Sequence, residues 1–310
     1  MWNGARFVGQ AIDSVRAQTL SDWDLVVVDD GSEDESARAA ARRGARVVRL
    51  PRNGGVLAAR RAGLQATRSE AVVFLDGDDR LRPTALERFA DALDRHPEAS
   101  GVYGDRVLIE EDGRTFGSER GALLAARPSG DVLAVLLRRN FLSTPAQMCA
   151  RRAALPPVET WDVGIRRMAD WYLWCRLATS GGFQYIGRGP VVEYRLRRGS
   201  MARSLATEDG GRTNIDELRP ALDAVFSLPE IVERFTPDEL RRLRRQAEAS
   251  AYAWKGQELL RGGDLARSRV YLRAALRSEP FLVVDLMTLV LAMLPRTPEA
   301  VRPWVGTLRR

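Results

Sequence analysis

Two runs of apolar residues, each ending in aspartates, constrain the fold of this chain most. The first, Leu25–Val28, continues into Asp29 and Asp30, and the second, Ala71–Leu75, continues into Asp76. A continuous apolar run that ends in Asp and Gly is typical of a strand buried on both faces. Because ligands bind outside the carboxyl ends of parallel strands, we expect both aspartate groups to point into one crevice.

Helical patterns lie between and after these two runs. Helices are expected at residues 5–16, 35–43, 56–67 (after a turn at 53–55) and 83–96, and a further short strand at 46–50. This alternation predicts an α/β fold, a Rossmann-like and mostly parallel sheet with helices on both faces. After residue 100 the pattern becomes irregular, with short strands expected at 102–103, 106–109, 183–186 and 191–194, and helices at 131–138 and 169–178.

From about residue 206 only helical patterns remain, so the sequence predicts an α/β domain at 1–205 and an all-α region at 206–310. Part of the second region is spaced like a single tetratricopeptide-type helix pair around the turn at 262–264. The residues that carry this spacing are Tyr252, Gly256, Leu259, Ser268, Leu272, Ala275 and Pro280. A lone pair cannot bury its own apolar face, so we interpret it as packing material.

The rarest residues exclude several classes of chemistry. His96 is the only histidine, Lys255 the only lysine, and Cys149 and Cys175 the only cysteines. The chain therefore has no disulfide framework, no four-cysteine metal site, no mechanism that needs two histidines and no P-loop lysine. Carboxylates, arginines and backbone amides must carry the chemistry.

The net charge of +7, from 48 basic and 41 acidic residues, favours anionic partners. The arginines are spread along the chain without a nucleic-acid-binding arm, so we expect no nucleic acid partner. There is no signal peptide and no apolar run long enough for a membrane helix; the longest, Phe281–Leu294, contains Asp285. We expect a cytoplasmic protein, with contact between the C-terminal helices and the inner membrane face as the alternative to their burial.

The segment Asp76-Gly77-Asp78-Asp79 places three carboxylates within four residues. Such carboxylates repel one another unless a cation offsets their charge. Mg²⁺ or Mn²⁺ would bind one or two of them together with substrate phosphates. The alternative is a solvated acidic turn that caps the following helix, but the position of the segment after a buried strand favours a site.

Five segments in order resemble the family 2 glycosyltransferases, inverting enzymes of the GT-A fold that use nucleotide-diphosphate sugars. They are Asn3 to Thr19, Asp29-Asp30-Gly31-Ser32, Asn53-Gly54-Gly55-Val56 with Arg60, Leu75 to Asp79, and Met168 to Trp174. The resemblance covers about residues 3–200. It implies a nucleotide-sugar part at about 1–100 and an acceptor part at about 101–205.

The resemblance also implies roles for individual residues. Asp29 or Asp30 matches the acidic contact to the nucleobase and ribose, and Arg60 a basic residue on the nucleotide side. Asp76 and Asp78 match the Asp-x-Asp motif, with Asp78 as the expected ligand of Mn²⁺ or Mg²⁺ and Asp76 as its companion.

The catalytic base of the family corresponds to Asp170. Arg195 and Arg197 match a downstream loop that helps hold the diphosphate. The implied reaction is a single displacement in which a carboxylate takes the proton of the acceptor hydroxyl, while a cation and arginines stabilise the departing diphosphate.

Three departures from the family pattern qualify this interpretation. Ala169 stands where the family has Glu, and Arg197 where it often has His. The family also begins with a buried strand, whereas this chain opens at Met1 after it. Since a central strand supplies hydrogen bonds to both neighbours, we expect an in-frame apolar strand upstream of Met1.

The leading interpretation is an inverting glycosyltransferase of cell-envelope or exported polysaccharide synthesis. Its donor would be a nucleotide-diphosphate sugar, UDP before GDP or dTDP, and its acceptor a saccharide or a lipid-linked saccharide. One alternative is a degenerate member that binds nucleotide sugar or a partner protein without catalysis. Another is a nucleotidyltransferase, which would need a lysine-rich activating loop that the single lysine cannot supply.

Overall fold

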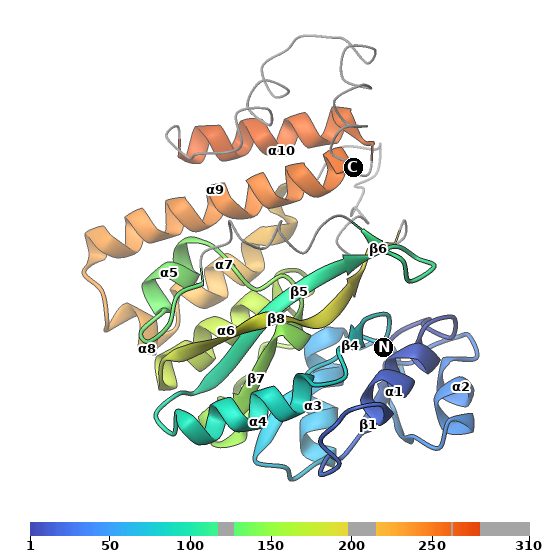
Figure 1. Cartoon of the computed structure of the whole chain (residues 1–310). Helices are drawn as coiled ribbons and strands as arrows, with labels where there is room; N and C mark the ends of the chain where they lie inside the picture. Colours follow the sequence, from blue (N-terminus) through green and yellow to red (C-terminus); the bar gives the residue numbers. More distant parts are fainter. Residues whose placement is uncertain (117–126, 198–214, 262, 280–310) are drawn as a thin grey trace. The chain divides into compact units, whose positions relative to one another are not determined.

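The computed structural model describes residues 1–116, 127–197, 215–261 and 263–279 (Figure 1). It divides into two compact units, Met1–Leu133 with Phe141–Arg195, and Ala134–Asn140 with Leu196–Arg310. The expected domain boundary at residue 205 lies outside the described residues, so that boundary stays a prediction.

The first unit opens with the predicted alternation of helices and strands. Its elements are α1 (Val8–Arg16), β1 (Val26–Asp29), α2 (Ser36–Arg42), β2 (Arg46–Arg49), α3 (Val56–Ala66) and β3 (Ala71–Val73). Helix α1 forms because its apolar residues recur at helical spacing, and the side chains of Val8, Ala11, Ile12 and Val15 are all buried. Three of the four residues of β1 are buried, although among the described strands β1 pairs with β2 alone.

The rest of the unit adds longer strands and one helix, α6 (Ala169–Ser180), that is buried along most of its length. Its elements are β4 (Arg80–Leu81), α4 (Ala85–Arg95), β5 (Gly101–Ile109), β6 (Thr115–Phe116), β7 (Met148–Arg151), α6 (Ala169–Ser180) and β8 (Phe183–Arg195). The short strands expected at 102–103 and 106–109 are one strand, β5, and those at 183–186 and 191–194 are one strand, β8. Short 3-10 helices lie at Pro145–Gln147, Arg152–Ala154 and Val158–Thr160.

The strands form two separate sheets, which corrects the expectation of one mostly parallel sheet. In the first, β1 pairs with β2 in parallel. The second has the order β3-β7-β5-β8-β4, with β6 on β5, and of its pairs only β5 with β8 is parallel. It is mixed because β7, a strand that the sequence pattern did not reveal, enters antiparallel between β3 and β5.

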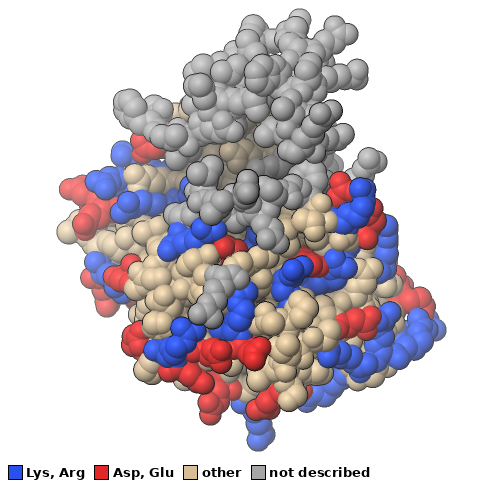
Figure 2. Space-filling view, viewed as in Figure 1, with Lys and Arg blue, Asp and Glu red and all other residues tan. Residues whose placement is uncertain are grey.

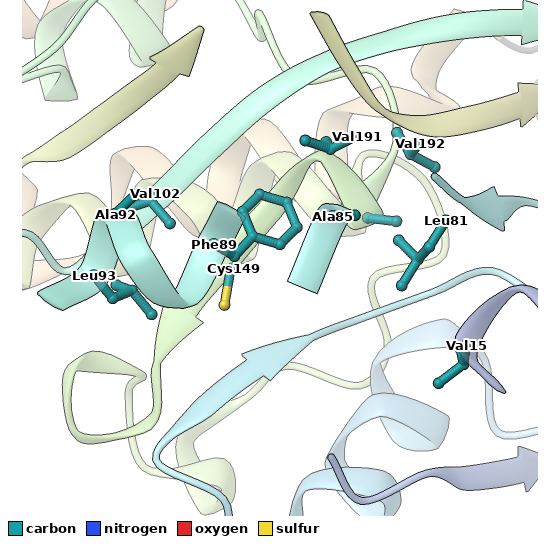
Figure 3. Packing of buried hydrophobic residues seen from close by; sticks show 11 residues of the cluster. Val15, Leu81, Ala85, Phe89, Ala92, Leu93, Val102, Cys149, Val191 and Val192 are labelled. Carbon is teal, nitrogen blue, oxygen red and sulfur yellow. The ribbon is translucent and has the colours of Figure 1, made fainter. Parts of the chain in front are cut away.

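Helices cover both faces of the second sheet, as predicted (Figure 1). Helix α4 lies across β5 and β8, and α6 lies on the opposite face. Figure 3 shows how Phe89 and Ala92 of α4 face Val102 of β5 and Cys149 of β7 in the core. Burial of the α4 side chains against β5, β7 and β8 holds these strands together. The turn at Asp76–Asp79, called the carboxylate turn below, lies between β3, which pairs with β7, and β4, which pairs with β8.

The second unit is helical throughout its described residues. It contains most of α5 (Leu133–Arg138), a 3-10 turn at Ile215–Leu218, α7 (Arg219–Phe226), α8 (Pro229–Val232), α9 (Pro237–Arg261) and α10 (Leu265–Ser278). Helices α9 and α10 pack so closely that a Cβ on Gly256 would lie 2.7 Å from Leu272. Lys255 is only 1% exposed and lies 3.5 Å from the Glu217 carboxylate. The apolar run Phe281–Leu294 lies outside the described residues.

None of the described helices combines the length and the apolar character that a bilayer crossing requires. Basic and acidic side chains are interspersed over the face of the molecule that Figure 2 presents. The expected absence of a nucleic acid partner therefore stays a prediction, as does contact with a membrane surface.

Candidate functional site

The two aspartates at the end of β1, Asp29 and Asp30, are buried and hold the neighbouring loops. Both oxygens of the Asp30 carboxylate accept hydrogen bonds from backbone amides, that of Gly54 at 2.7 Å and that of Gly55 at 2.9 Å. Asp29 accepts a bond from the Ser32 amide at 3.2 Å, and its second oxygen lies 3.2 Å from Nε of Arg49. In this structure Asp30 therefore shapes the loop before α3 and Asp29 the turn that follows β1, and their contact with a nucleoside stays a prediction.

Met1 lies between the two groups of aspartates. Its amino group donates to the carbonyl of Val28 at 2.6 Å, and its carbonyl accepts from the amide of Asp30 at 2.8 Å. A Cβ on Gly77 would meet the Met1 side chain at 3.0 Å, so Met1 also packs on the turn that follows β3. Burial lowers the pKa of the Met1 amine, although Asp76, Asp30 and Asp29 act in the opposite direction.

The guanidinium of Arg60 joins two predicted site residues. Arg60 comes from the buried face of α3 and is only 7% exposed. Its Nη1 donates to the Asp170 carboxylate, and its Nη2 lies 3.6 Å from the Asp76 carboxylate. Asp76 follows β3 and Asp170 lies in the first turn of α6, so Arg60 joins a nearby strand end to a residue 110 positions further along the chain. Of the aspartates predicted to converge, Asp76 and Asp170 therefore meet, while Asp29 and Asp30 bond to other loops.

An aromatic floor supports this cation. The Arg60 guanidinium lies 5.6 Å from the ring centre of Phe74, and that ring in turn packs against Trp161 and Trp174 at 6.4 Å each. Burial alone would lower the pKa of Arg60, but the negative charges of Asp170 and Asp76 outweigh it and raise that pKa. Trp174 is buried in the core, as is Trp171, so neither forms an exposed acceptor platform.

The start of α6 sets the position of Asp170. Met168 precedes the helix in the left-handed conformation, with φ 55°, which is strained for a residue with a side chain. Buried Arg176, from the second turn of α6, donates to the carbonyl and hydroxyl oxygens of Thr160 at 2.8 Å each. These contacts hold the loop before α6, so the Asp170 carboxylate, 28% exposed, is kept at the helix start.

The surroundings of Asp76 favour the neutral form of its carboxyl group. Loss of hydration, and then the charges of Asp170 and Asp78, raise the pKa of Asp76 to about 6, although Arg60 acts in the opposite direction. The side chain is nevertheless 41% exposed, so water screens part of this effect. A partly exposed carboxylate with the carboxylates of Asp170 and Asp78 nearby is suited to a cation.

The carboxylates of Asp76 and Asp78 supply only part of the ligands that Mn²⁺ or Mg²⁺ needs. Among the described residues, no three His, Cys, Asp or Glu side chains are grouped to hold a metal ion. Mg²⁺ usually takes one or two carboxylates and completes its shell with water and substrate phosphates. Asp76 and Asp78 supply that number of carboxylates, and the crowding at Asp76 is what a cation would relieve, so the residues fit a cation that arrives with a diphosphate.

The two arginines expected at the diphosphate differ in their placement. Arg195, the last residue of β8, is 1% exposed, and its Nε donates to the carbonyl of Asp78 at 2.8 Å. Arg195 is therefore buried against the carboxylate turn, and its guanidinium donates hydrogen bonds to protein oxygens. Arg197 belongs to the second compact unit, so its role at the diphosphate stays a prediction.

Arg166 is a site residue that the sequence analysis missed. Its Nη1 donates to the Asn53 side chain at 3.2 Å, and a Cβ on Gly55 would lie 2.3 Å from that nitrogen. Gly55 also has φ +90°, a backbone conformation that favours glycine, and a side chain there would displace Arg166. Only the four-residue distance from Asp170 could have indicated that Arg166 lies beside the predicted nucleotide loop.

Comparison with known families identifies the class. The family model for glycosyl transferase family 2 matches residues 1–171 of the 310 in the chain. The chain therefore belongs to glycosyl transferase family 2, and the resemblance found in its motifs is confirmed.

Individual relatives match to different extents. The succinoglycan biosynthesis protein ExoO of Rhizobium meliloti is 28% identical over 264 residues, 81% of this chain and 73% of ExoO. The uncharacterized glycosyltransferase EpsJ of Bacillus subtilis is 36% identical over 100 residues, 31% of this chain and 29% of EpsJ. The chain spans less than half the length of several of the curated relatives it matches.

A solved structure supports the fold. The S. aureus TarS fragment 1–349, in complex with UDP-GlcNAc, aligns with all of this chain and 85% of its own at a TM-score of 0.61. Sequence identity is 14%, so the similarity concerns the fold alone. Together with the family assignment it confirms the predicted GT-A fold.

Proposed function

We propose that this protein transfers a sugar with inversion from a nucleotide-diphosphate sugar to an acceptor hydroxyl, with Asp170 as the catalytic base. The observation that carries the proposal is the meeting of Asp170 and Asp76 at Arg60. It joins the motif expected to act on the acceptor with the motif expected to bind the diphosphate. A solvated acidic turn or a helix-start charge would not need a shared, buried cation.

The reaction is a single displacement at the anomeric carbon. The acceptor oxygen forms a bond to this carbon while the bond to the diphosphate oxygen breaks, and the acceptor proton passes to the Asp170 carboxylate. Arg60 orients that carboxylate through its hydrogen bond, and the strained Met168 holds the helix start. No histidine is required for this step.

The departing nucleoside diphosphate gains negative charge that the protein must stabilise. A Mn²⁺ or Mg²⁺ ion bound with the substrate would be held by Asp78 and Asp76, and it would neutralise charge on the diphosphate. The exposed Arg166 beside the loop at 53–55 supplies a further positive charge on the nucleotide side. Arg60, fixed between two carboxylates, stays in place as this charge develops.

The substrate class follows from the relatives. UDP-GlcNAc is bound in a TarS structure, and ExoO is named for succinoglycan biosynthesis. We therefore infer a UDP-sugar donor and a saccharide or lipid-linked acceptor in cell-envelope or exported polysaccharide synthesis. The proposed place of action is the cytoplasm or the inner face of the membrane.

The test uses a panel of nucleotide sugars with Mn²⁺. Release of nucleoside diphosphate is measured for the wild type, Asp170→Asn, Asp78→Ala and the exposed control Asp91→Asn. We expect Asp170→Asn to lose turnover by at least about 100-fold while it still binds the donor, because general base catalysis contributes about 100-fold or more. Asp78→Ala should lose both turnover and donor binding, and Asp91→Asn should keep both.

The alternative outcomes are distinct. Donor binding by the wild type without turnover on any acceptor would favour the degenerate, non-catalytic interpretation. Turnover that survives in Asp170→Asn would refute the assignment of the base. Release of pyrophosphate in place of a nucleoside diphosphate would indicate a nucleotidyltransferase.

A further inference from the structure

Arg195 is the most heavily hydrogen-bonded buried cation near the site. Its guanidinium donates to four protein oxygens and stacks 4.8 Å from the ring centre of Phe7. The acceptors are the carbonyls of Asp78 at 2.8 Å, Glu111 at 2.8 Å and Glu110 at 3.3 Å, and Oε1 of Gln10 at 2.7 Å. Because Arg195 is 1% exposed and makes four side-chain hydrogen bonds, its guanidinium is fixed in position.

The same residue also holds the carboxylate turn through its backbone. The amide of Asp79 closes the turn by donating to the carbonyl of Asp76 at 3.1 Å. The buried Asp79 carboxylate then accepts the backbone amide of Arg195 at 2.9 Å and the hydroxyl of Thr144 at 2.7 Å. Arg195 therefore grips two successive residues of the turn, Asp78 by its carbonyl and Asp79 by its carboxylate.

The charge of Arg195 has a second effect on this turn. All four acceptors of the guanidinium are carbonyl or amide oxygens, so none of these bonds is a salt bridge. Its positive charge still attracts the nearby carboxylates of Asp78 and Asp79. A buried cation close to crowded carboxylates reduces the cost of keeping them together.

We propose that Arg195, anchored by Gln10, is a positioning residue that sets the affinity of the Asp76–Asp79 turn for a divalent cation and its diphosphate without contacting either. The inference rests on the proposed function, because that function makes the turn the cation and diphosphate site. It replaces the expected direct contact between Arg195 and the diphosphate.

Binding measurements test this role independently of turnover. Free Mn²⁺ is followed by electron paramagnetic resonance during titration with UDP present, for the wild type, Gln10→Ala, Arg195→Lys and Arg195→Met. Arg82→Ala is the matched control, because Arg82 pairs with Glu193 of β8 at 2.9 Å and has no bond to the turn. Thermal unfolding confirms that each variant is folded.

If Arg195 positions the turn, its variants and the Gln10 variant should lose affinity for Mn²⁺ to different degrees. Loss of one hydrogen bond at a charged group corresponds to about 10-fold in affinity, so Arg195→Lys should weaken Mn²⁺ binding by about that factor. Gln10→Ala keeps Arg195 but removes the acceptor of one of its guanidinium hydrogen bonds. This variant should weaken Mn²⁺ binding by about 3-fold, less than Arg195→Lys does. In the transfer assay the KM for Mn²⁺ should rise, and saturating Mn²⁺ should restore most of kcat.

Three results would overturn the proposal. In the first, Gln10→Ala and Arg195→Lys bind Mn²⁺ and UDP as the wild type does. In the second, Gln10→Ala is unchanged while Arg195→Lys loses UDP affinity even without cation, as expected of a direct phosphate ligand. In the third, the wild type itself binds neither Mn²⁺ nor UDP. A wild type that binds both but transfers no sugar refutes only the proposed function.

Discussion

Replacing Asp76 by asparagine should stabilise the folded protein while it weakens substrate binding. The pKa of Asp76 is raised from 3.8 to about 6 in the folded state. A shift of two units corresponds to about 3 kcal/mol between the two protonation states. Because the side chain is 41% exposed, water screening reduces the effect, and we expect about 1 kcal/mol.

The sign follows from proton linkage. The folded protein holds the Asp76 proton more tightly than the unfolded chain does, so this group's stabilising effect is complete below about pH 4 and is lost as the pH rises through about 6. Asp76→Asn has no proton to lose. Its advantage over the wild type should therefore be absent near pH 4 and complete above pH 7.

The assay is thermal unfolding of Asp76→Asn, the wild type and the exposed control Asp22→Asn at pH 4.5 and pH 8. A gain of about 1 kcal/mol corresponds to a midpoint higher by about 2–4 °C for a unit of this size. Asp22→Asn should match the wild type at both values. The reasoning is refuted if Asp76→Asn unfolds below the wild type at pH 8, or if its advantage is equal at the two values.

Three further outcomes follow from buried residues of the first unit. Phe89→Ala should lower the free energy of unfolding by about 3–5 kcal/mol in chemical denaturation, because the ring fills the core between α4 and the sheet; a loss below about 1 kcal/mol would contradict that packing. Burial raises the pKa of the Cys149 thiol to about 12 and also raises the pKa of the Cys175 thiol. A thiol reagent at pH 8 should therefore label neither cysteine until the protein is unfolded. Rapid labelling of the native protein would be inconsistent with this burial. Asp30→Ala leaves two amides of the loop before α3 without their acceptor and should cost about 2–4 kcal/mol in unfolding and weaken nucleotide binding, whereas unchanged nucleotide affinity would count against the role of that loop.

The first hundred residues were largely predictable from local pattern. Strand β1 and helices α1 to α4 lie within two or three residues of the expected ranges, because apolar periodicity and turn residues determine them locally. The long strands were harder. Gly104 and Asp105 in β5 resemble a turn, yet β5 continues through this point with a shift in its pairing with β8.

Strand β7 was missed for a physical reason. Met148–Arg151 is short, follows Pro145 and has no alternation of apolar and polar residues. It is buried between β3 and β5, so its strand state is determined by partners distant in the sequence. The mixed character of the sheet could therefore not be read from the chain.

The candidate site was predictable in its residue types and less so in its contacts. The motifs indicated Asp76, Arg60 and Asp170, and these three meet. The motifs could not show that Asp30 spends both oxygens on the amides of Gly54 and Gly55. Every residue other than proline has a backbone amide, so the residue types do not show which amides will bond to a side chain.

The burial of Lys255 has a practical consequence for handling this protein. Lys255 is the single lysine and its side chain is buried, so reagents that acylate lysine find no accessible lysine side chain in the native fold. Both cysteines are buried as well. A cysteine introduced at an exposed position would therefore be labelled with little background, which makes single-site dyes and surface immobilisation straightforward.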